Sequence, residues 1–259
     1  MKKILIRVLI GLVVLLILGV LAVSFFLDGA IKKGVETYGP QFTKVDIKLD
    51  AVKVSILSGG GNVKGLVVGN PQGYKTTNAI SVGSATLALS PGSLLSDKIV
   101  IKKIEVIAPE ITFEGGLSEN NLKQILDNLT AATGGTGEKK PETAPKEKAP
   151  GKKLQVDDFL IKDAKLHMSL GMMGGKSITM PLPDIHLTGL GQGPEGITAA
   201  DLSKRVMGEI LASAGKVVTS DAVNNIAKGA TEAAKGAVKT AGEAVNKATK
   251  GITDLFKKK

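Results

Sequence analysis

Two histidines and two nearby aspartates are the residues of this chain best suited in type to bind a metal ion. His167 and His186 stand in stretches where apolar and polar residues alternate, close in sequence to Asp163 and Asp184. Imidazole and carboxylate groups are common zinc ligands, but the chain has neither the His-Glu-x-x-His spacing nor a paired-helix spacing that would bring these ligands together. We therefore predict no metal site and no bound cofactor.

A glycine-rich segment imitates the end of a phosphate-binding loop. It reads Gly174-Gly175-Lys176-Ser177, but the glycine required five residues before Gly175 is Leu170, and no long helical pattern follows Ser177. A hairpin tip is the simpler interpretation. The chain has no cysteine, which excludes a thiolate metal site, a disulfide and a cysteine nucleophile. We find no catalytic constellation and predict that the protein is not an enzyme.

An uncharged run near the N-terminus predicts the element that positions the rest of the chain. Val8 to Leu27 holds twenty residues without a charge, and a helix of that length covers roughly 30 Å, one hydrocarbon thickness. A cleaved signal peptide is the alternative, because Lys2, Lys3 and Arg7 precede the run, although the run exceeds a normal signal core. We favour an uncleaved anchor whose short basic N-terminal side is cytoplasmic.

The region after the anchor alternates with a period of two, which predicts strands. A short helix over residues 28–38, stopped by Gly39-Pro40, comes first. A strand from Val45 to Ile56 follows, in which the alternation slips at Asp50-Ala51 and predicts a bulge or bend. Four more runs are separated by Gly and Pro and predict an antiparallel meander; they cover residues 63–68, 80–89, 99–107 and 110–114. Ser118 is the expected N-cap of an amphipathic helix carrying Leu122, Ile125, Leu126 and Leu129.

The second half of the chain divides into a linker, more strands and a helical tail. Residues 133–153 are rich in Lys, Glu, Pro and Gly and predict a disordered linker. Strand patterns resume after it, and Thr198 then caps a helix that we expect to reach about Ser213. From Ala222 apolar residues return at the α-helical period with lysines on other faces, which predicts either a helix on an anionic bilayer surface or one resting on the sheet. The boundaries that we expect are an anchor at 1–27, a first β module at 28–132, a linker at 133–153, a second β segment at 154–197 and a helical region at 198–259.

The positive net charge of the chain predicts an anionic partner. The chain has 34 Lys and Arg against 24 Asp and Glu, a formal net charge of +10. Nucleic acid fits poorly, because an anchor precedes the domain, Trp is absent, and the strands lack the basic and aromatic pattern of RNA-binding sheets. Much of the excess lies at the two termini and in the linker. Anionic lipid headgroups fit that distribution better.

An ordered set of segments resembles the N-terminal module of the AsmA-like proteins of bacterial envelopes. The set comprises Gly65 to Pro71, the Ser93-Leu94-Leu95 step, the strand 99–107 closed by Ala108-Pro109-Glu110-Ile111, and the helix start at Asn120-Asn121. The resemblance covers about Met1 to Leu129, and residues 154–190 resemble later strand-turn-strand units of the family more loosely. It implies a mainly β fold with helices: a transmembrane helix and an elongated antiparallel sheet forming a U-shaped trough. The long C-terminal amphipathic helix that the periodicity predicts departs from the large members of that family.

The same resemblance, which extends to chorein-type lipid-transfer proteins, implies a function. It implies a single-pass protein of the bacterial inner membrane, held by residues 8–27, with its bulk in the periplasm and a part in phospholipid binding or transport for the outer membrane. The residues that fit such a trough are also suited to an ordinary core: Ile80, Val82, Leu87, Leu89, Ile99, Ile101, Ile111 and Phe113. Nine or ten strands about 4.8 Å apart span roughly 45 to 50 Å, too short to bridge two membranes. A scaffold for other envelope proteins, without lipid carriage, is the alternative function.

Overall fold

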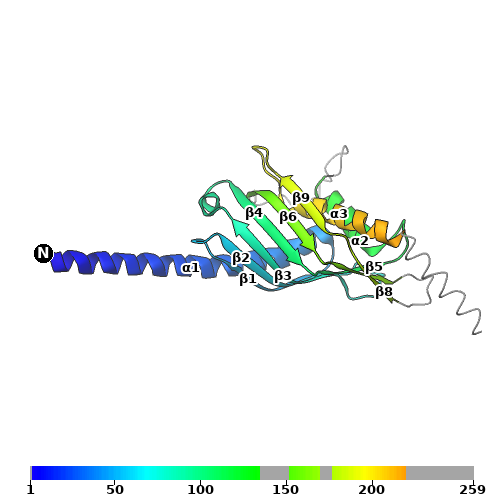
Figure 1. Cartoon of the computed structure of the whole chain (residues 1–259), viewed down its shortest axis with the longest axis horizontal. Helices are drawn as coiled ribbons and strands as arrows, with labels where there is room; N and C mark the ends of the chain where they lie inside the picture. The colour runs from blue at the N-terminus through cyan, green and yellow to red at the C-terminus, as the bar shows by residue number, and fades with distance from the viewer. Residues whose placement is uncertain (1, 135–151, 170–176, 220–259) are drawn as a thin grey trace, which may run out of the picture.

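The fold is a mixed α/β arrangement in which helices cover one face of an open sheet (Figure 1). The computed structural model describes residues 2–134, 152–169 and 177–219; before Phe26, it describes few side chains of the first helix. The helices are α1 (Lys2–Thr43), α2 (Asn121–Ala132) and α3 (Ala199–Val218), with a 3-10 turn, η1 (Pro91–Leu95). The strands are β1 (Ile47–Val54), β2 (Gly60–Gly69), β3 (Asn78–Leu89), β4 (Lys98–Ile107), β5 (Glu110–Glu114), β6 (Lys153–Lys162), β7 (Lys165–Ser169), β8 (Ser177–Pro181) and β9 (Ile185–Leu190).

The sheet is mixed, so the prediction of a purely antiparallel sheet is wrong. β1 to β4 form the expected antiparallel meander, but β4 pairs in parallel with β6, and β5 pairs in parallel with β7. The reason is the connection after β5, which runs through α2 and residues 133–152 before the chain enters β6. A connection of that length can return the chain to the start of the sheet, as a parallel neighbour requires.

Six of the strands are halves of three longer strands. β4 and β5 pair with successive parts of β3 in one register, since Ser84 pairs with Ile107 and Ile80 with Ile111. The same offset relates β6 to β4 and β7 to β5, and a single register relates β9 to β6 and β8 to β7. The loosely predicted strand-turn-strand units are therefore continuous strands with a kink, and the sheet is six long strands wide.

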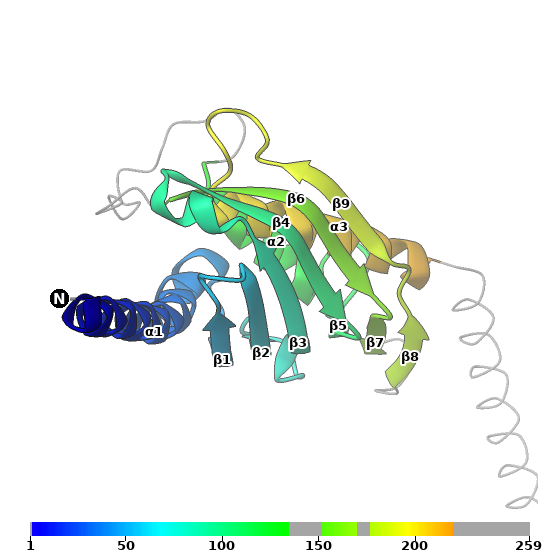
Figure 2. The same cartoon turned by 60° about the vertical axis from the view of Figure 1, so that its left-hand side comes forward.

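The kinks line up as one crease across the whole sheet. At each kink the inward-facing residues change from odd to even positions or the reverse, while the register stays the same on both sides. The changes that make up this crease fall at residues 50–51, 64–65, 83–84, 107–108, 162–163 and 183–184, which lie opposite one another in the pairing. Positive φ angles at three crease residues, Gly65 (62°), Ala108 (50°) and Asp163 (53°), turn the chain there. The predicted slip at Asp50-Ala51 is thus a bend without a bulge, and the sheet curves strongly (Figure 2).

The crease divides the sheet into two halves, named by their distance from the apolar run of α1. The proximal half holds β4, β6, β9 and the adjoining ends of β1, β2 and β3, with the β1–β2 turn (55–59) and the β3–β4 connection (90–97) at its tip. The distal half holds β5, β7, β8 and the other ends of β1 to β3. At its tip lie the β2–β3 connection (70–77) and the β5–α2 connection (115–120).

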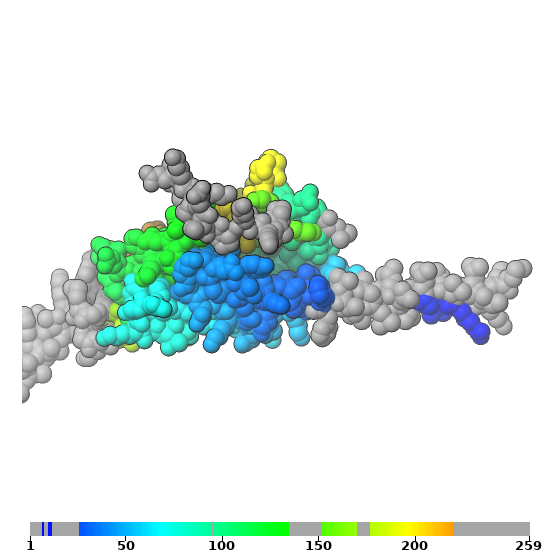
Figure 3. All heavy atoms as spheres, turned by 180° about the vertical axis from the view of Figure 1, so that it is seen from behind, coloured from blue at the N-terminus to red at the C-terminus, as the bar shows by residue number. Residues whose placement is uncertain are grey.

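All three helices lie on the same, inner face of the sheet. α2 and α3 pack against each other and against the sheet, and their buried residues Leu122, Ile125, Leu129, Met207, Ile210 and Ala214 belong to the main core cluster. The C-terminal part of α1 covers β1 and contacts α2 (Figure 3), where the Asn128 side chain donates a hydrogen bond to the carbonyl oxygen of Thr43 at 2.8 Å. The inner face is therefore largely a core.

α1 is one helix where two were expected. It runs on from the apolar segment through Gly39-Pro40 and ends at Thr43, so the predicted stop at Gly39-Pro40 is wrong. Pro40 removes only one helical N–H, and its carbonyl oxygen accepts the amide of Lys44 at 2.9 Å. The left-handed φ of Lys44, 59°, then ends the helix. In the part of the chain that the structure describes, no helix is both long enough and apolar enough to cross a membrane.

The two predicted N-caps differ in outcome. Thr198 caps α3 as predicted, accepting the Asp201 amide at 3.0 Å, and α3 runs to Val218, beyond the expected end. Asn120, not Ser118, caps α2 and accepts the Lys123 amide at 2.8 Å. The predicted tail helix from Ala222 and most of the predicted linker lie outside the described residues.

Candidate functional site

The eight residues predicted to line a trough all lie on the inner face, but the two halves of the sheet bury them to different degrees. Four are in the distal half, beneath α2, and are at most 8 % exposed: Ile80, Val82, Ile111 and Phe113. In the proximal half, Ile101 is equally buried, whereas Leu87, Leu89 and Ile99 are only half-buried. The helices thus close the distal half of the inner face more completely than the proximal half.

The half-buried residues of the proximal half form one aliphatic surface, which we call the proximal patch. It consists of Val63, Leu87, Leu89, Ile99 and Ile104, on three neighbouring strands. The pairing of Leu87 with Ile104 makes it continuous across β3 and β4. On one side lies β1, which α1 covers, and on the other lie β6 and β9, which α3 contacts through β9. Apolar surface left partly open between two covering helices is suited to binding an aliphatic chain.

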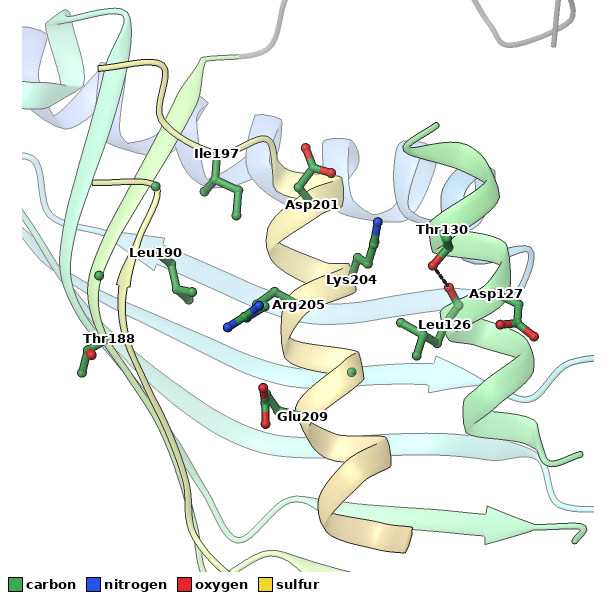
Figure 4. A pocket seen from close by; sticks show the side chains of 13 residues that line it. Leu126, Asp127, Thr130, Thr188, Leu190, Ile197, Asp201, Lys204, Arg205 and Glu209 are labelled. Carbon is green, nitrogen blue, oxygen red and sulfur yellow. Dashed lines mark hydrogen bonds between the residues drawn. The ribbon is translucent and has the colours of Figure 1, made fainter. Parts of the chain in front are cut away.

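A cavity that is largely open to solvent lies between α2, α3 and the end of β9 (Figure 4). Its volume is about 690 Å³, and Leu126, Leu190 and Ile197 supply apolar walls. Ile197 makes a backbone bridge to Leu154 of β6, and Leu154 pairs with Ile99 of the proximal patch. Leu154 of β6 thus lies, in the backbone pairing, between Ile197 of the cavity wall and Ile99 of the patch.

Two cations and an acid of α3 give the cavity its charge. Figure 4 shows Lys204 directed toward α2, with Arg205 and Glu209 on the side of α3 that faces β9. Within the described ranges, neither cation forms an ion pair with a protein carboxylate. The other two carboxylates of the lining have local partners, since Asp127 pairs with Lys123 and Asp201 accepts the Thr198 hydroxyl at 2.6 Å. Arg and Lys in this state can bind a phosphate group.

The histidines and aspartates considered for metal binding do not converge. His186 Nε2 lies 2.5 Å from Asp158 Oδ1, whereas His167 Nδ1 lies 2.8 Å from the Thr179 hydroxyl on a different strand pair. Asp184 accepts the backbone N–H of Asp163 at 3.3 Å. Among the described residues no group of three potential metal ligands occurs. The segment Gly174-Gly175-Lys176 is outside those residues, and Ser177 begins β8, the antiparallel partner of β7.

Residues from two of the family-like segments meet at the distal tip in a buried polar cluster around Glu114. The Glu114 carboxylate accepts hydrogen bonds from the backbone N–H groups of Lys75 (2.6 Å) and Thr76 (2.9 Å) and from the Thr76 hydroxyl (2.6 Å). The Asn121 side chain accepts the Glu114 amide at 2.9 Å and donates to the Asn70 side chain at 2.8 Å. We call these residues the distal cluster. It ties the β2–β3 connection to β5 and α2, so its role is structural.

Hydrogen bonding sets the charge state of Glu114. Burial alone would raise the pKa of this carboxyl, but the bonds from the Thr76 hydroxyl and from the Lys75 and Thr76 amides outweigh it, and the pKa lies below 4.5, its ordinary value. The carboxylate is thus held ionised. On the outer face, Lys162 and Lys103, each 3.3 Å from Glu105, likewise lower the pKa of that carboxyl.

Comparison with models of known protein families, with curated proteins and with solved structures finds no match for this chain. The resemblance to AsmA-like proteins stays an expectation from the sequence.

The sequence did not point to the cavity. The cavity-lining residues of α3 lie on its polar side. The apolar periodicity of a helix predicts only which side is buried, so the polar side is expected to face solvent. A local signal exists in Lys204-Arg205, a pair of adjacent cations one helical turn before Glu209. The polar side of α3 lines a cavity only because α2 packs beside it, and the sequence does not report that packing.

Proposed function

We propose that this chain is a membrane-anchored, AsmA-like protein of the bacterial envelope that binds phospholipid, or helps to move it, without catalysis. Residues 8–27 anchor it in the inner membrane with the N-terminus in the cytoplasm and the sheet in the periplasm. Acyl chains contact the proximal patch, and the phosphate of the headgroup interacts with Lys204 and Arg205. The tail from Ala222 contributes a further contact with anionic lipid.

The observation that carries this proposal is the uneven coverage of the inner face. α2 closes the distal half, but Leu87, Leu89 and Ile99 keep part of their aliphatic surface exposed in the half nearer the apolar run of α1, where Leu89 and Leu27 belong to one apolar cluster. An acyl chain gains roughly 0.8 kcal/mol for each methylene that it buries against such a surface. Lipid that leaves the bilayer beside α1 would meet this patch first.

A scaffold for other envelope proteins is the second candidate function, and one observation favours it. Five of the eight predicted trough residues are buried in a core that includes α2 and α3, so the inner face as it stands has no continuous open trough. In that case the half-buried aliphatic residues would contact a protein partner.

Photocrosslinking separates the two functions. A photoreactive phenylalanine analogue replaces Leu87 in the full-length chain, and irradiated cells are analysed for adducts by mass spectrometry. A phospholipid adduct is expected, because the side chain at this position belongs to the proximal patch. Thr86, the neighbouring and exposed residue of β3, is the matched control and should give no lipid adduct.

Two outcomes contradict lipid binding. Equal lipid adducts at positions 86 and 87 would mean unspecific contact with the bilayer. Protein adducts at position 87 without lipid would support the scaffold. The Arg205→Glu variant adds a second readout, since reversing this charge should reduce the lipid adduct at position 87 without changing the circular dichroism spectrum.

A further inference from the structure

The turn between β1 and β2 points toward the N-terminal end of α1. β1 runs antiparallel to α1, as three contacts show: Asp28 Oδ1 accepts the Val54 amide at 2.8 Å, the Lys32 ammonium donates to the Asp50 carbonyl at 3.0 Å, and Glu36 Oε1 accepts the Leu49 amide at 3.0 Å. Beyond Val54 the chain therefore continues past Asp28, alongside the last residues of the apolar run.

The tip of this turn carries an exposed leucine, Leu57, beside the last residues of the apolar run. Leu57 is 78 % exposed and Phe26 is 79 % exposed, and these are the highest values for large apolar side chains among the residues whose side chains are described. Phe26 is two residues before Asp28, and Leu57 is three residues after Val54, the hydrogen-bond partner of Asp28. Exposed apolar residues that are scattered singly over a surface do not indicate a binding site. Leu57 and Phe26 differ because both lie at the end of the apolar run.

The turn is held rigidly, so the exposure of Leu57 is built into the fold. The Gly59 amide donates to the Ser55 carbonyl and the Ser55 amide to the Gly60 carbonyl, both at 2.8 Å. The Leu89 amide donates to the Gly59 carbonyl at 2.6 Å, which ties the turn to β3. Gly59 has a φ of 71°, and a Cβ there would lie 2.4 Å from the Leu89 carbonyl oxygen. A mobile loop could fold its leucine inward, but this turn is held by its own hydrogen bonds and by β3.

We propose that the β1–β2 turn is a second membrane contact, in which Leu57 inserts into the surface of the same bilayer that α1 enters. This rests on the anchor of the proposed function. The occupant is the lipid surface because α1 sets both the height and the direction of the turn. Val54, the last residue of β1, is level with Asp28. The turn beyond it therefore lies beside the last residues of the apolar run, which in the proposed function is the boundary between headgroups and acyl chains. α1 and the turn together fix the tilt of the sheet against the membrane and hold the proximal patch close to it.

Fluorescence quenching in vesicles tests this directly, and the absence of cysteine from the chain makes single-site labelling clean. The full-length Leu57→Cys variant is labelled with bimane and reconstituted into vesicles of phosphatidylethanolamine and phosphatidylglycerol that contain a spin-labelled lipid. The label is expected to lose about half or more of its fluorescence to a quencher placed 5–10 Å below the surface. Leu117→Cys is the matched control, because Leu117 is also exposed (61 %) but lies at the distal tip, and its label should stay unquenched.

A third label distinguishes failure of the contact from failure of the anchor. Leu16→Cys lies in the apolar run and should be quenched most by a spin label deep in the bilayer. Quenching at positions 16 and 57 but not at 117 supports the proposal. Quenching at 16 alone overturns the membrane contact and leaves the anchor intact. No quenching at 16 overturns the anchor and the contact with it, and equal quenching at 57 and 117 would show unspecific adhesion of the domain.

Discussion

Glu114 and Gly65 show how single residues hold distant parts of this chain together. Glu114 brings β5 to the β2–β3 connection through three hydrogen bonds to its carboxylate. Gly65 lies at the crease with a φ of 62°, and a Cβ there would lie 2.0 Å from the Asp50 carboxylate. Each position has a local physical reason for its residue type.

Replacing Glu114 by Gln should destabilise the protein by about 1–3 kcal/mol at neutral pH, because the amide keeps only one acceptor oxygen and its NH2 group then faces the donors of either Lys75 or Thr76. Thermal unfolding followed by circular dichroism measures the loss. Glu119→Gln is the control: this exposed glutamate lies in the β5–α2 connection, and its change should leave the unfolding temperature unchanged.

The effect of Glu114 should depend on pH with a definite sign. Its pKa is lower in the folded state than the ordinary 4.5, so its stabilisation is complete well above that value and is lost as the pH falls from about 4.5 through the folded pKa. The difference in unfolding temperature between wild type and the Gln variant should therefore shrink in acid. A constant difference down to the lowest pH at which both fold would contradict the hydrogen-bond account.

Gly65→Ala should cost at least about 1–2 kcal/mol, since a left-handed backbone disfavours a side chain and the Asp50 carboxylate occupies the space. Gly83→Ala offers a strict comparison, because Gly83 lies at the same crease in the register but has no atom within 4 Å of an added Cβ and no positive φ. Its effect should stay within about 0.5 kcal/mol. Equal losses from both variants, measured by denaturant unfolding, would show that the crease does not depend on the backbone of Gly65.

Residue types and spacing predicted some of these features and missed others. The Thr198 cap follows from a local pattern and was predicted, whereas the cap of α2 was assigned to Ser118, although Asn120 is equally suited in type. The distal cluster joins residues as far apart as Asn70 and Asn121, and no spacing in the sequence reports that contact.

At the scale of elements, the contact between α1 and β1 protects an edge of the sheet. Leu27, Ile31 and Val35, the stripe predicted for this helix, pack against β1, while the adjacent stripe of Asp28, Lys32 and Glu36 binds backbone groups of β1. An edge strand with unpaired N–H and C=O groups invites pairing with another chain. α1 satisfies part of that edge and at the same time joins the apolar run rigidly to the sheet.

Removing the two acceptors should loosen this contact measurably. In the Asp28→Ala, Glu36→Ala double variant the amides of Val54 and Leu49 lose their partners, at about 1 kcal/mol each. Hydrogen exchange of the segment 47–54, followed by mass spectrometry, should then become roughly five-fold faster or more. Lys33→Ala changes an exposed residue of the same helix and should have no effect. Unchanged exchange in the double variant would mean that apolar packing alone holds α1.

Strand positions were predicted well because alternation is a local signal, but the sheet order was not. The predicted run 110–114 coincides with β5, and the other runs match β2, β3 and β4 within a few residues. The parallel pairs depend on where the chain returns after α2, which local patterns do not encode. The sequence shows the change of alternation at Asp50-Ala51 in one strand. Only the strand pairing shows that the other five long strands change at the same crease.

At the scale of the whole molecule, the sheet is open and its two edges differ. α1 covers the β1 edge, whereas in the described ranges no element pairs with the outer side of β8 and β9. The sheet is curved, but α2 and α3 occupy much of its inner face, and five of the eight residues predicted to line a trough are buried there. Under the proposed function, this size and coverage suit a module that receives lipid near one membrane rather than a conduit between two.

The crease also limits how such a protein could be lengthened during evolution. A strand added beside β8 and β9 would have to carry its own change of parity opposite Pro183 and Asp184; otherwise half of its apolar residues would face water. A strand whose alternation is unbroken would therefore pair poorly at that edge, because its apolar residues would face the core on one side of the crease only. Each added strand must therefore change its inward-facing positions at the same point. Among homologous chains, the position of the residue at this change should be conserved more strictly than its type.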